Sequence, residues 1–286
     1  MRTRKEIDVK LSEYVLSVHA EFYESADEVI NDCRTLPIRH SSYEVDHSCD
    51  KSWTGVATYD EALALLRDGY TPVIEAFKAE LNKVTAYGPR FAFENNVHGF
   101  APIVPLVLKG IPTCMYNMTM RTIKAKVLDI CYDMGITGGF SPEQVLEAGK
   151  TVLGAVLALE RLGYRINLYA IQRHFDRGEK ALDFMCVKVK SSNTPLDLKR
   201  MSYPLIHPSF FRVIGFDWQS KSPIARYLGS GRGSAFAPTH SKEDVRKIAH
   251  AIFGKQATYI SAESLIREHC DKEKLKEMFT DVHPEK

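Results

Sequence analysis

Apolar side chains recur at helical spacing along much of the first part of the chain. Residues 25–28 (Ser-Ala-Asp-Glu) and residues 58–61 (Thr-Tyr-Asp-Glu) both have the form of a capping box, which marks the start of a helix. A third stretch opens at Pro72, and its apolar residues between positions 73 and 84 lie along one helical face. These patterns predict a mainly helical N-terminal region over residues 1–98.

The following stretch has neither helical nor strand periodicity. Residues 99–115 read GFAPIVPLVLKGIPTCM, in which prolines and glycines interrupt an apolar sequence. Prolines at this density exclude a continuous helix or a central strand, and the segment is too hydrophobic for a flexible linker. We therefore expect residues 99–119 to form an ordered connector that packs on the core.

From residue 120 onward, short apolar runs alternate with helix signals. The run ending near residue 128 predicts a buried strand in the interior of a sheet, and residues 141–144 (Ser-Pro-Glu-Gln) start a helix. The further expected elements are two strands paired as a hairpin at 164–172 and 182–189, a strand at 210–216, a helix at 241–253, a strand at 258–260 and a helix from 261. This order predicts an α/β fold with a mostly parallel, doubly wound sheet and one antiparallel edge over residues 120–286.

Three residues in this half stand where a known family holds a metal. Asp129 closes the first strand, Thr194 follows the hairpin and Asp217 closes the expected next strand. With the element order, these positions resemble a von Willebrand factor A domain, which implies a Mg²⁺ or Mn²⁺ site at the carboxyl edge of the sheet. Cys131 and Asp133 replace the two serines of the family's first loop, and a thiol is a poor magnesium ligand. The resemblance thus implies a degenerate site, formed by Asp129, Asp133, Thr194 and Asp217. The alternative is that the aspartates only cap turns or helices.

The whole chain also resembles a group of uncharacterised bacteriophage proteins. The likeness lies in residues 52–70 (SWTGVATYDEALALLRDGY), in the proline-rich stretch, and in the A-type half that follows. It implies a phage or prophage context, and hence a host cytoplasm, but no particular chemistry.

Composition, charge and missing motifs exclude several classes of function. The net charge is +2, with 44% hydrophobic and 26% charged residues, so no global field attracts DNA or a membrane. The six cysteines have no metal-ligand spacing, which favours reduced thiols and a cytoplasmic protein. Because no apolar run follows the first residues and none reaches the length of a bilayer, we expect neither a signal peptide nor a membrane-spanning helix. Phosphate-binding loops, dinucleotide fingerprints, zinc motifs and nucleophile elbows are also missing. We therefore expect a non-enzymatic binding protein without a cofactor.

One expected loop has the composition of a binding element. It begins at Lys221 and carries cations, aromatic rings and closely spaced glycines, a combination that holds single-stranded nucleic acid. Its candidate contact residues are Lys221, Arg226, Tyr227, Arg232 and Phe236. The alternative is a surface connector.

The sequence favours an adaptor that binds a protein through loops at the carboxyl edge of the sheet. A single-strand-binding accessory protein is the second reading, and an enzyme with an unrecognised site is the third.

Overall fold

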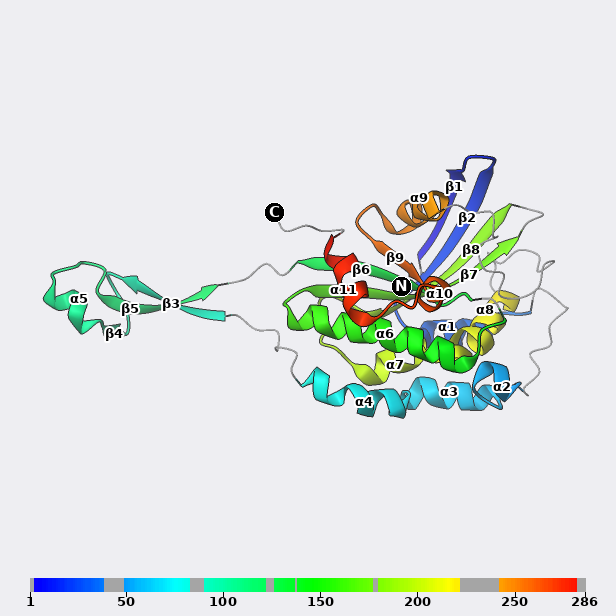
Figure 1. Cartoon of the computed structure of the whole chain (residues 1–286), viewed down its shortest axis with the longest axis horizontal. Helices are drawn as coiled ribbons and strands as arrows, with labels where there is room; N and C mark the ends of the chain where they lie inside the picture. The colour runs from blue at the N-terminus through cyan, green and yellow to red at the C-terminus, as the bar shows by residue number, and fades with distance from the viewer. Residues whose placement is uncertain are drawn as a thin grey trace. The chain divides into compact units, whose positions relative to one another are not determined.

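A computed structural model gives the arrangement of the chain in two compact units (Figure 1). It describes residues 3–38, 49–82, 90–121, 126–136, 138–176, 180–221 and 242–281. The large unit joins residues 1–84 to residues 127–286, and the small unit comprises residues 85–126.

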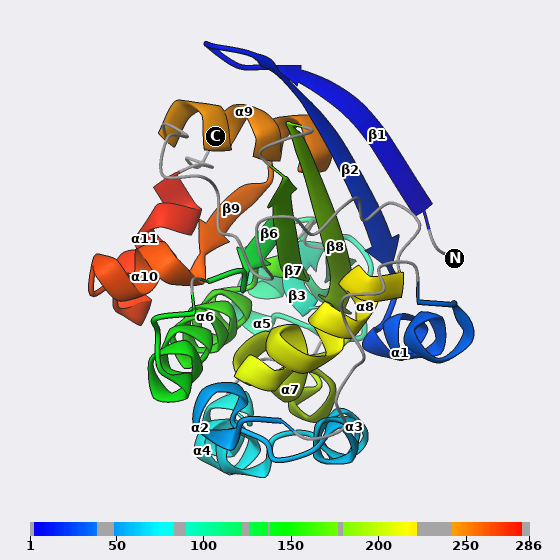
Figure 2. The same ribbon diagram turned by 90° about the vertical axis from the view of Figure 1, so that its right-hand side faces the viewer.

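The large unit is built on a six-stranded mixed sheet in the order β1-β2-β8-β7-β6-β9 (Figure 2). The strands are β1 (Thr3–Lys10), β2 (Val15–Tyr23), β6 (Val127–Asp133), β7 (Arg165–Asp176), β8 (Ala181–Lys190) and β9 (Thr258–Ser261). β6 lies parallel to both of its neighbours, β7 and β9, and β2 lies parallel to β8. β7 and β8 form the expected antiparallel hairpin, and β1 and β2 form a second one at the edge. The α/β class and the interior position of β6 are confirmed.

The prediction of a mainly helical N-terminal region was wrong for its first residues, which form the strands β1 and β2. β1 reads TRKEIDVK and is mostly exposed at the sheet edge, so it lacks an apolar face that periodicity could reveal. β2 carries His19 and Glu21 at buried positions, which interrupts its apolar pattern. The helices with capping boxes are confirmed: α1 (Ala26–Thr35) and α3 (Tyr59–Asp68) begin after Ser25 and Thr58, whose side chains accept the expected backbone N–H groups.

The expected strand at residues 210–216 is also wrong. This segment is a π-helix, η1 (Phe210–Gly215), followed directly by α8 (Phe216–Lys221). All residues of η1 are buried, and a short apolar run that is buried on every side has no periodicity that separates strand from helix. Gly215 has a structural role here, since a Cβ at this position would lie 1.4 Å from the Gln172 side-chain oxygen.

Helices cover both faces of the sheet, and each face has its own apolar core. One core lies under α6 (Pro142–Arg161), which begins with the predicted capping box at Ser141, and α7 (Leu198–Ile206). The other core lies under α9 (Lys242–Phe253), across the sheet (Figure 2). The remaining helices of this unit are α2 (Lys51–Thr54), α4 (Thr71–Leu81), α10 (Ala262–Arg267) and α11 (Lys272–Asp281).

Two buried glycines of α6 give a matched test of how closely α6 and α7 pack. A Cβ at Gly149 would lie 2.6 Å from the Ile206 Cα and 2.8 Å from the Leu205 carbonyl oxygen, so backbone must move. A Cβ at Gly154 meets only side chains, at 3.6 Å or more. We expect Gly149→Ala to destabilise the protein by about 1–3 kcal/mol. Gly154→Ala should instead stabilise it by up to about 1 kcal/mol, through helix propensity. Urea unfolding measures both, and equal effects of the two substitutions would contradict the close approach at Gly149.

The small unit consists of a three-stranded antiparallel sheet and one short helix. The strand order is β3-β5-β4, with β3 (Arg90–Asn96), β4 (Ala101–Pro102) and β5 (Met115–Arg121). The helix, α5 (Val104–Leu108), has Pro105 in its first turn. The segment 99–119 therefore lies within a second compact unit that also includes β3.

Candidate functional site

The small unit presents an unusual amount of apolar surface. None of its residues between 93 and 118 is buried. Nine of the fourteen large exposed hydrophobic residues in the described part of the chain lie here: Phe93, Val97, Phe100, Val104, Val107, Leu108, Ile111, Tyr116 and Met118. Leu108 is 82% exposed and Phe100 is 66% exposed. We call these nine side chains the apolar surface.

Three aromatic rings of the apolar surface lie close together. The Phe100 ring lies 6.1 Å from the Phe93 ring and 6.5 Å from the Tyr116 ring, measured between centroids. The three rings come from β3, from the residue before β4 and from β5, and the sheet holds them together. Aromatic groups fixed on a sheet offer large contact areas at a small entropic cost.

The middle of this unit, residues 91–120, carries little charge, and the unit's other cations lie at its two ends: Arg90, Arg121, Lys124 and Lys126. Residues 91–120 contain one acidic and one basic residue, Glu94 and Lys109, whereas charged residues make up 26% of the whole chain. A concentration of exposed apolar side chains is typical of an interaction site in a folded protein, and the core of a protein interface is depleted of charge. The low charge density is the signal in the sequence that could have identified residues 91–120 as a candidate for binding.

Two of the residues expected to hold a metal lie toward the end of the sheet where β7 begins. Asp129 accepts a hydrogen bond of 2.7 Å from the Asn167 side chain. Asn167 also accepts one of 2.7 Å from the backbone N–H of Ser192. The Thr194 hydroxyl donates to the Ser191 carbonyl oxygen at 3.0 Å. These bonds order the segment after β8, so both residues have structural partners.

The other two expected ligands are held elsewhere. Asp133 lies four positions along β6 from Asp129, about 13 Å away at the usual rise of a strand, and pairs with Arg173 at 2.5 Å. Asp217 is in α8, where it pairs with Lys221 at 2.9 Å and accepts a hydrogen bond of 3.0 Å from Tyr59. The four residues therefore do not form the predicted cluster. Asp133 lies a full four positions along β6 from Asp129, and Asp217 lies in a helix where the end of a strand was expected. Among the described residues, no group of three or more His, Cys, Asp or Glu could hold a metal ion.

The expected nucleic-acid loop can be followed only at its first residue. Arg226, Tyr227, Arg232 and Phe236 lie outside the described residues. Lys221 ends α8, pairs with Asp217 and donates a hydrogen bond to the Cys33 carbonyl oxygen. Its ammonium group is thus held by the protein.

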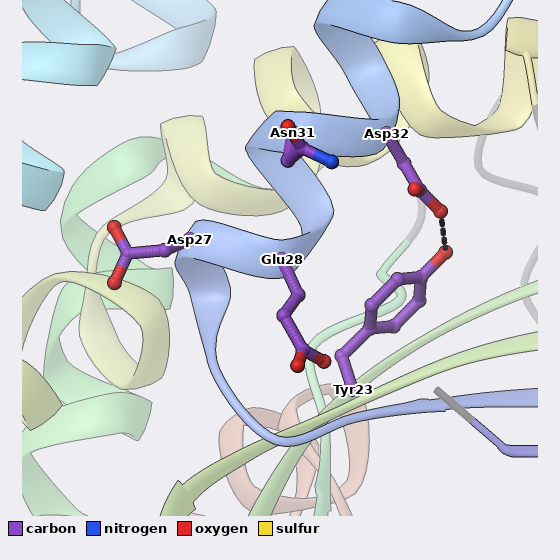
Figure 3. A pocket seen from close by; sticks show the side chains of 5 residues that line it. All are labelled: Tyr23, Asp27, Glu28, Asn31 and Asp32. Carbon is purple, nitrogen blue, oxygen red and sulfur yellow. Dashed lines mark hydrogen bonds between the residues drawn. The ribbon is translucent and has the colours of Figure 1, made fainter. Parts of the chain in front are cut away.

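Two pockets open on the large unit. One, of about 380 Å³, is acidic: it is lined by Tyr23, Asp27, Glu28, Asn31 and Asp32, and Tyr23 donates to Asp32 at 2.9 Å (Figure 3). The other, of about 440 Å³, lies where β8 ends, and its lysines are paired. Lys188 lies 2.8 Å from Glu24, and Lys190 lies 2.8 Å from the buried Glu160. Burial lowers the pKa of Lys190. Paired cations leave little net charge to attract an anion.

Comparison with known proteins gives one family assignment. A family model described as "Domain of unknown function (DUF7192)" matches residues 5–281, which includes both units. No curated protein and no solved structure matches the chain. Among the described helices, none has the length and hydrophobicity needed to cross a membrane.

Proposed function

The chain belongs to this DUF7192 family over nearly its whole length, and we propose that it is a binding protein that docks a protein partner through the apolar surface of residues 85–126. The observation that supports the proposal is the gathering of nine large exposed hydrophobic side chains on a unit with no buried residue between positions 93 and 118. The binding role expected from the sequence is kept. The proposed contact surface is now the small unit, in place of the loop that begins at Lys221.

The chemistry of the surface favours a protein over a nucleic acid. Affinity for nucleic acids depends on cations that neutralise phosphates. The stretch that carries the apolar surface, residues 91–120, offers only Lys109, and the other cations of the unit lie at its ends: Arg90, Arg121, Lys124 and Lys126. Aromatic and methionine side chains such as Phe93, Phe100 and Met118 are the types enriched in protein interfaces. The matching partner surface is an apolar groove with few charges.

A small sheet with no buried residue between positions 93 and 118 also has reason to need a partner. Small β-sheets are stable only when an apolar face is covered, and a unit of this size buries little surface by itself. Covering Phe100 and Leu108 would supply that burial. We expect these two side chains to contribute most to the affinity, since large residues at the centre of an interface dominate binding.

The test compares polar substitutions at matched exposed positions. A photo-reactive phenylalanine analogue at position 100 or 108 should crosslink a discrete protein in an extract of the cells that express the chain. Phe100→Glu and Leu108→Glu should each weaken retention of that protein by tenfold or more, which is about 1.4 kcal/mol. Leu162→Glu, at a residue of the large unit that is 61% exposed, is the control and should leave retention unchanged.

Two outcomes would contradict the proposal. One is crosslinking at position 162 equal to that at positions 100 and 108. The other is a captured protein that both glutamate variants retain as well as the wild type does. Crosslinking to lipid in place of protein would assign the surface to a membrane instead.

We also keep two proposals that come from the sequence. One is the likeness to an A-type domain, supported by the parallel β6-α6-β7 unit and the hairpin that follows it. The other is single-strand binding by the loop that contains Arg226 and Arg232, for which the sign would be retention on single-stranded DNA that falls steeply with salt. The phage origin and the cytoplasmic location are proposals of the same kind.

A further inference from the structure

Three polar side chains form a line at the end of the central sheet where β2 and β8 begin. His19 on β2 and Asp183 on β8 are partners in the parallel register. The His19 Nδ1 lies 3.0 Å from an Asp183 carboxylate oxygen, and the His19 Nε2 lies 3.3 Å from the Ser17 hydroxyl oxygen. Ser17 and His19 are two positions apart on one strand, so their side chains share a face of the sheet. Serine, imidazole and carboxylate are therefore connected in series.

The carboxylate determines the direction of the hydrogen bonds. An ionised aspartate can only accept, so the His19 Nδ1 must carry a proton to bond with Asp183. In a neutral imidazole the other nitrogen, Nε2, is then an acceptor that faces the Ser17 hydroxyl. This is the tautomer that a histidine needs in order to take a proton from a serine.

Solvent exposure increases along the three side chains, from Asp183 through His19 to Ser17. Asp183 is 1% exposed and His19 is 5% exposed, whereas Ser17 is partly exposed. A buried carboxylate stabilises the imidazolium that forms during proton transfer more strongly than one in water would. A nucleophile must in turn meet its substrate, and Ser17 is the member of the line that solvent reaches.

A second histidine–serine pair in the chain shows what a structural arrangement looks like. The His207 Nδ1 lies 2.8 Å from the Ser209 hydroxyl oxygen, and Ser209 donates to the Tyr203 hydroxyl at 3.1 Å. Ser209 is fully buried. The ring nitrogen that faces Ser209 also accepts the backbone N–H of that serine. This pair has the same residue types but no exposed hydroxyl, and it provides a matched control.

We propose that Ser17, His19 and Asp183 form a nucleophilic serine site that reacts with activated acyl esters. The Ser17 oxygen attacks the acyl carbon while His19 Nε2 takes the hydroxyl proton. The ester C–O bond then breaks, the leaving alkoxide receives that proton from His19, and the acyl group stays on Ser17. Water, deprotonated by His19, releases the acid in the same way and regenerates the serine. Asp183 holds the imidazole and offsets its positive charge.

A fluorophosphonate probe tests the site on the full chain. The Ser17 oxygen would displace fluoride at phosphorus, and the label would be found by mass spectrometry on the peptide that contains Ser17. Ser17→Ala should abolish this label, and His19→Gln should slow labelling by at least about 100-fold, the usual contribution of a general base. Asp183→Asn should also slow it, because the wrong tautomer becomes available. Ser209→Ala should label at the wild-type rate.

Several results would overturn the proposal. The first is a native protein in which Ser17 stays unlabelled at probe concentrations that label a known serine hydrolase. Equal labelling of Ser17 in native and urea-unfolded protein would also do so, because activation requires the folded geometry. So would a His19→Gln variant with native circular dichroism and an unchanged labelling rate. Should His19→Gln fail to fold, the comparison of native with unfolded wild type still decides the question.

Discussion

Replacing Arg173 with methionine is expected to lower the free energy of unfolding by about 3–5 kcal/mol, because it leaves a buried carboxylate without its partner. Arg173 is almost fully buried, lies 2.5 Å from Asp133 and donates at 2.7 Å to the Tyr259 hydroxyl. Asp133 is fully buried and also accepts from the Gly135 backbone N–H at 2.8 Å. Removal of the guanidinium leaves two donors to this carboxylate among the described residues, the Tyr259 hydroxyl and the Gly135 N–H, and both are neutral.

The pH dependence of Arg173→Met provides a check on the cause. Burial raises the pKa of Asp133, and the neighbouring Arg173 acts against that rise. Without Arg173 the folded-state pKa of Asp133 lies further above its unfolded value. The protonated form is then the one that folding favours, so the variant loses stability as pH rises through that pKa. Urea unfolding should show a smaller difference from the wild type at pH 5 than at pH 8.

A double variant separates the ion pair from packing. Arg173→Met combined with Asp133→Leu removes both charges, and buried pairs replaced by apolar residues are often nearly neutral in stability. We expect the double variant to be more stable than Arg173→Met alone. If it is less stable, the loss in the single variant comes from packing of the Arg173 side chain and not from an unpaired Asp133.

His207 is expected to make the protein less stable in acid. Burial lowers the pKa of this imidazole to about 4, while an unfolded chain has an ordinary value near 6.5. Between these two values the unfolded state binds a proton that the folded state does not. The contribution of His207 is therefore present above pH 6.5 and is lost as pH falls toward 4, by about 3 kcal/mol in total.

The measurement is the free energy of unfolding against pH for the wild type and His207→Asn. Asparagine can accept from the Ser209 backbone, as the His207 Nδ1 does at 3.3 Å, but it does not titrate. As pH falls from 6.5 to 4, the wild type should lose about 3 kcal/mol more stability than the variant, since the variant lacks this proton uptake. Curves that stay parallel would show that His207 has no part in acid unfolding.

Local signals in the sequence identified helix starts and strand pairs well. Ser25, Thr58 and Ser141 each cap the helix that was predicted, because capping depends on residues only a few positions apart. The β7–β8 hairpin was predicted for the same reason. The wrong assignments were a fully buried segment, residues 210–216, and the strands β1 and β2, where burial is decided by distant parts of the chain.

The proposed serine site of Ser17, His19 and Asp183 could not be predicted from the sequence in the same way. His19 and Asp183 are 164 residues apart, and only the pairing of β2 with β8 brings them together. The predicted metal residues failed for a related reason. Their expected cluster assumed that Asp217 ends a strand, whereas it lies in a helix and pairs with Lys221. The strands and the helix of the small unit were not predicted, because prolines and glycines interrupt the periodicity of residues 99–115.

The pairing of β2 with β8 also sets the order of folding on the ribosome. The hairpin of β1 and β2 is synthesised early, but its partner β8 ends at Lys190. At about 5–20 residues per second, the hairpin waits roughly 8–30 s for that partner. During this time the far edge of β2 is a free strand edge that can pair with another chain. Nascent chains that stop before β8 should therefore depend on chaperones more than chains that extend past it.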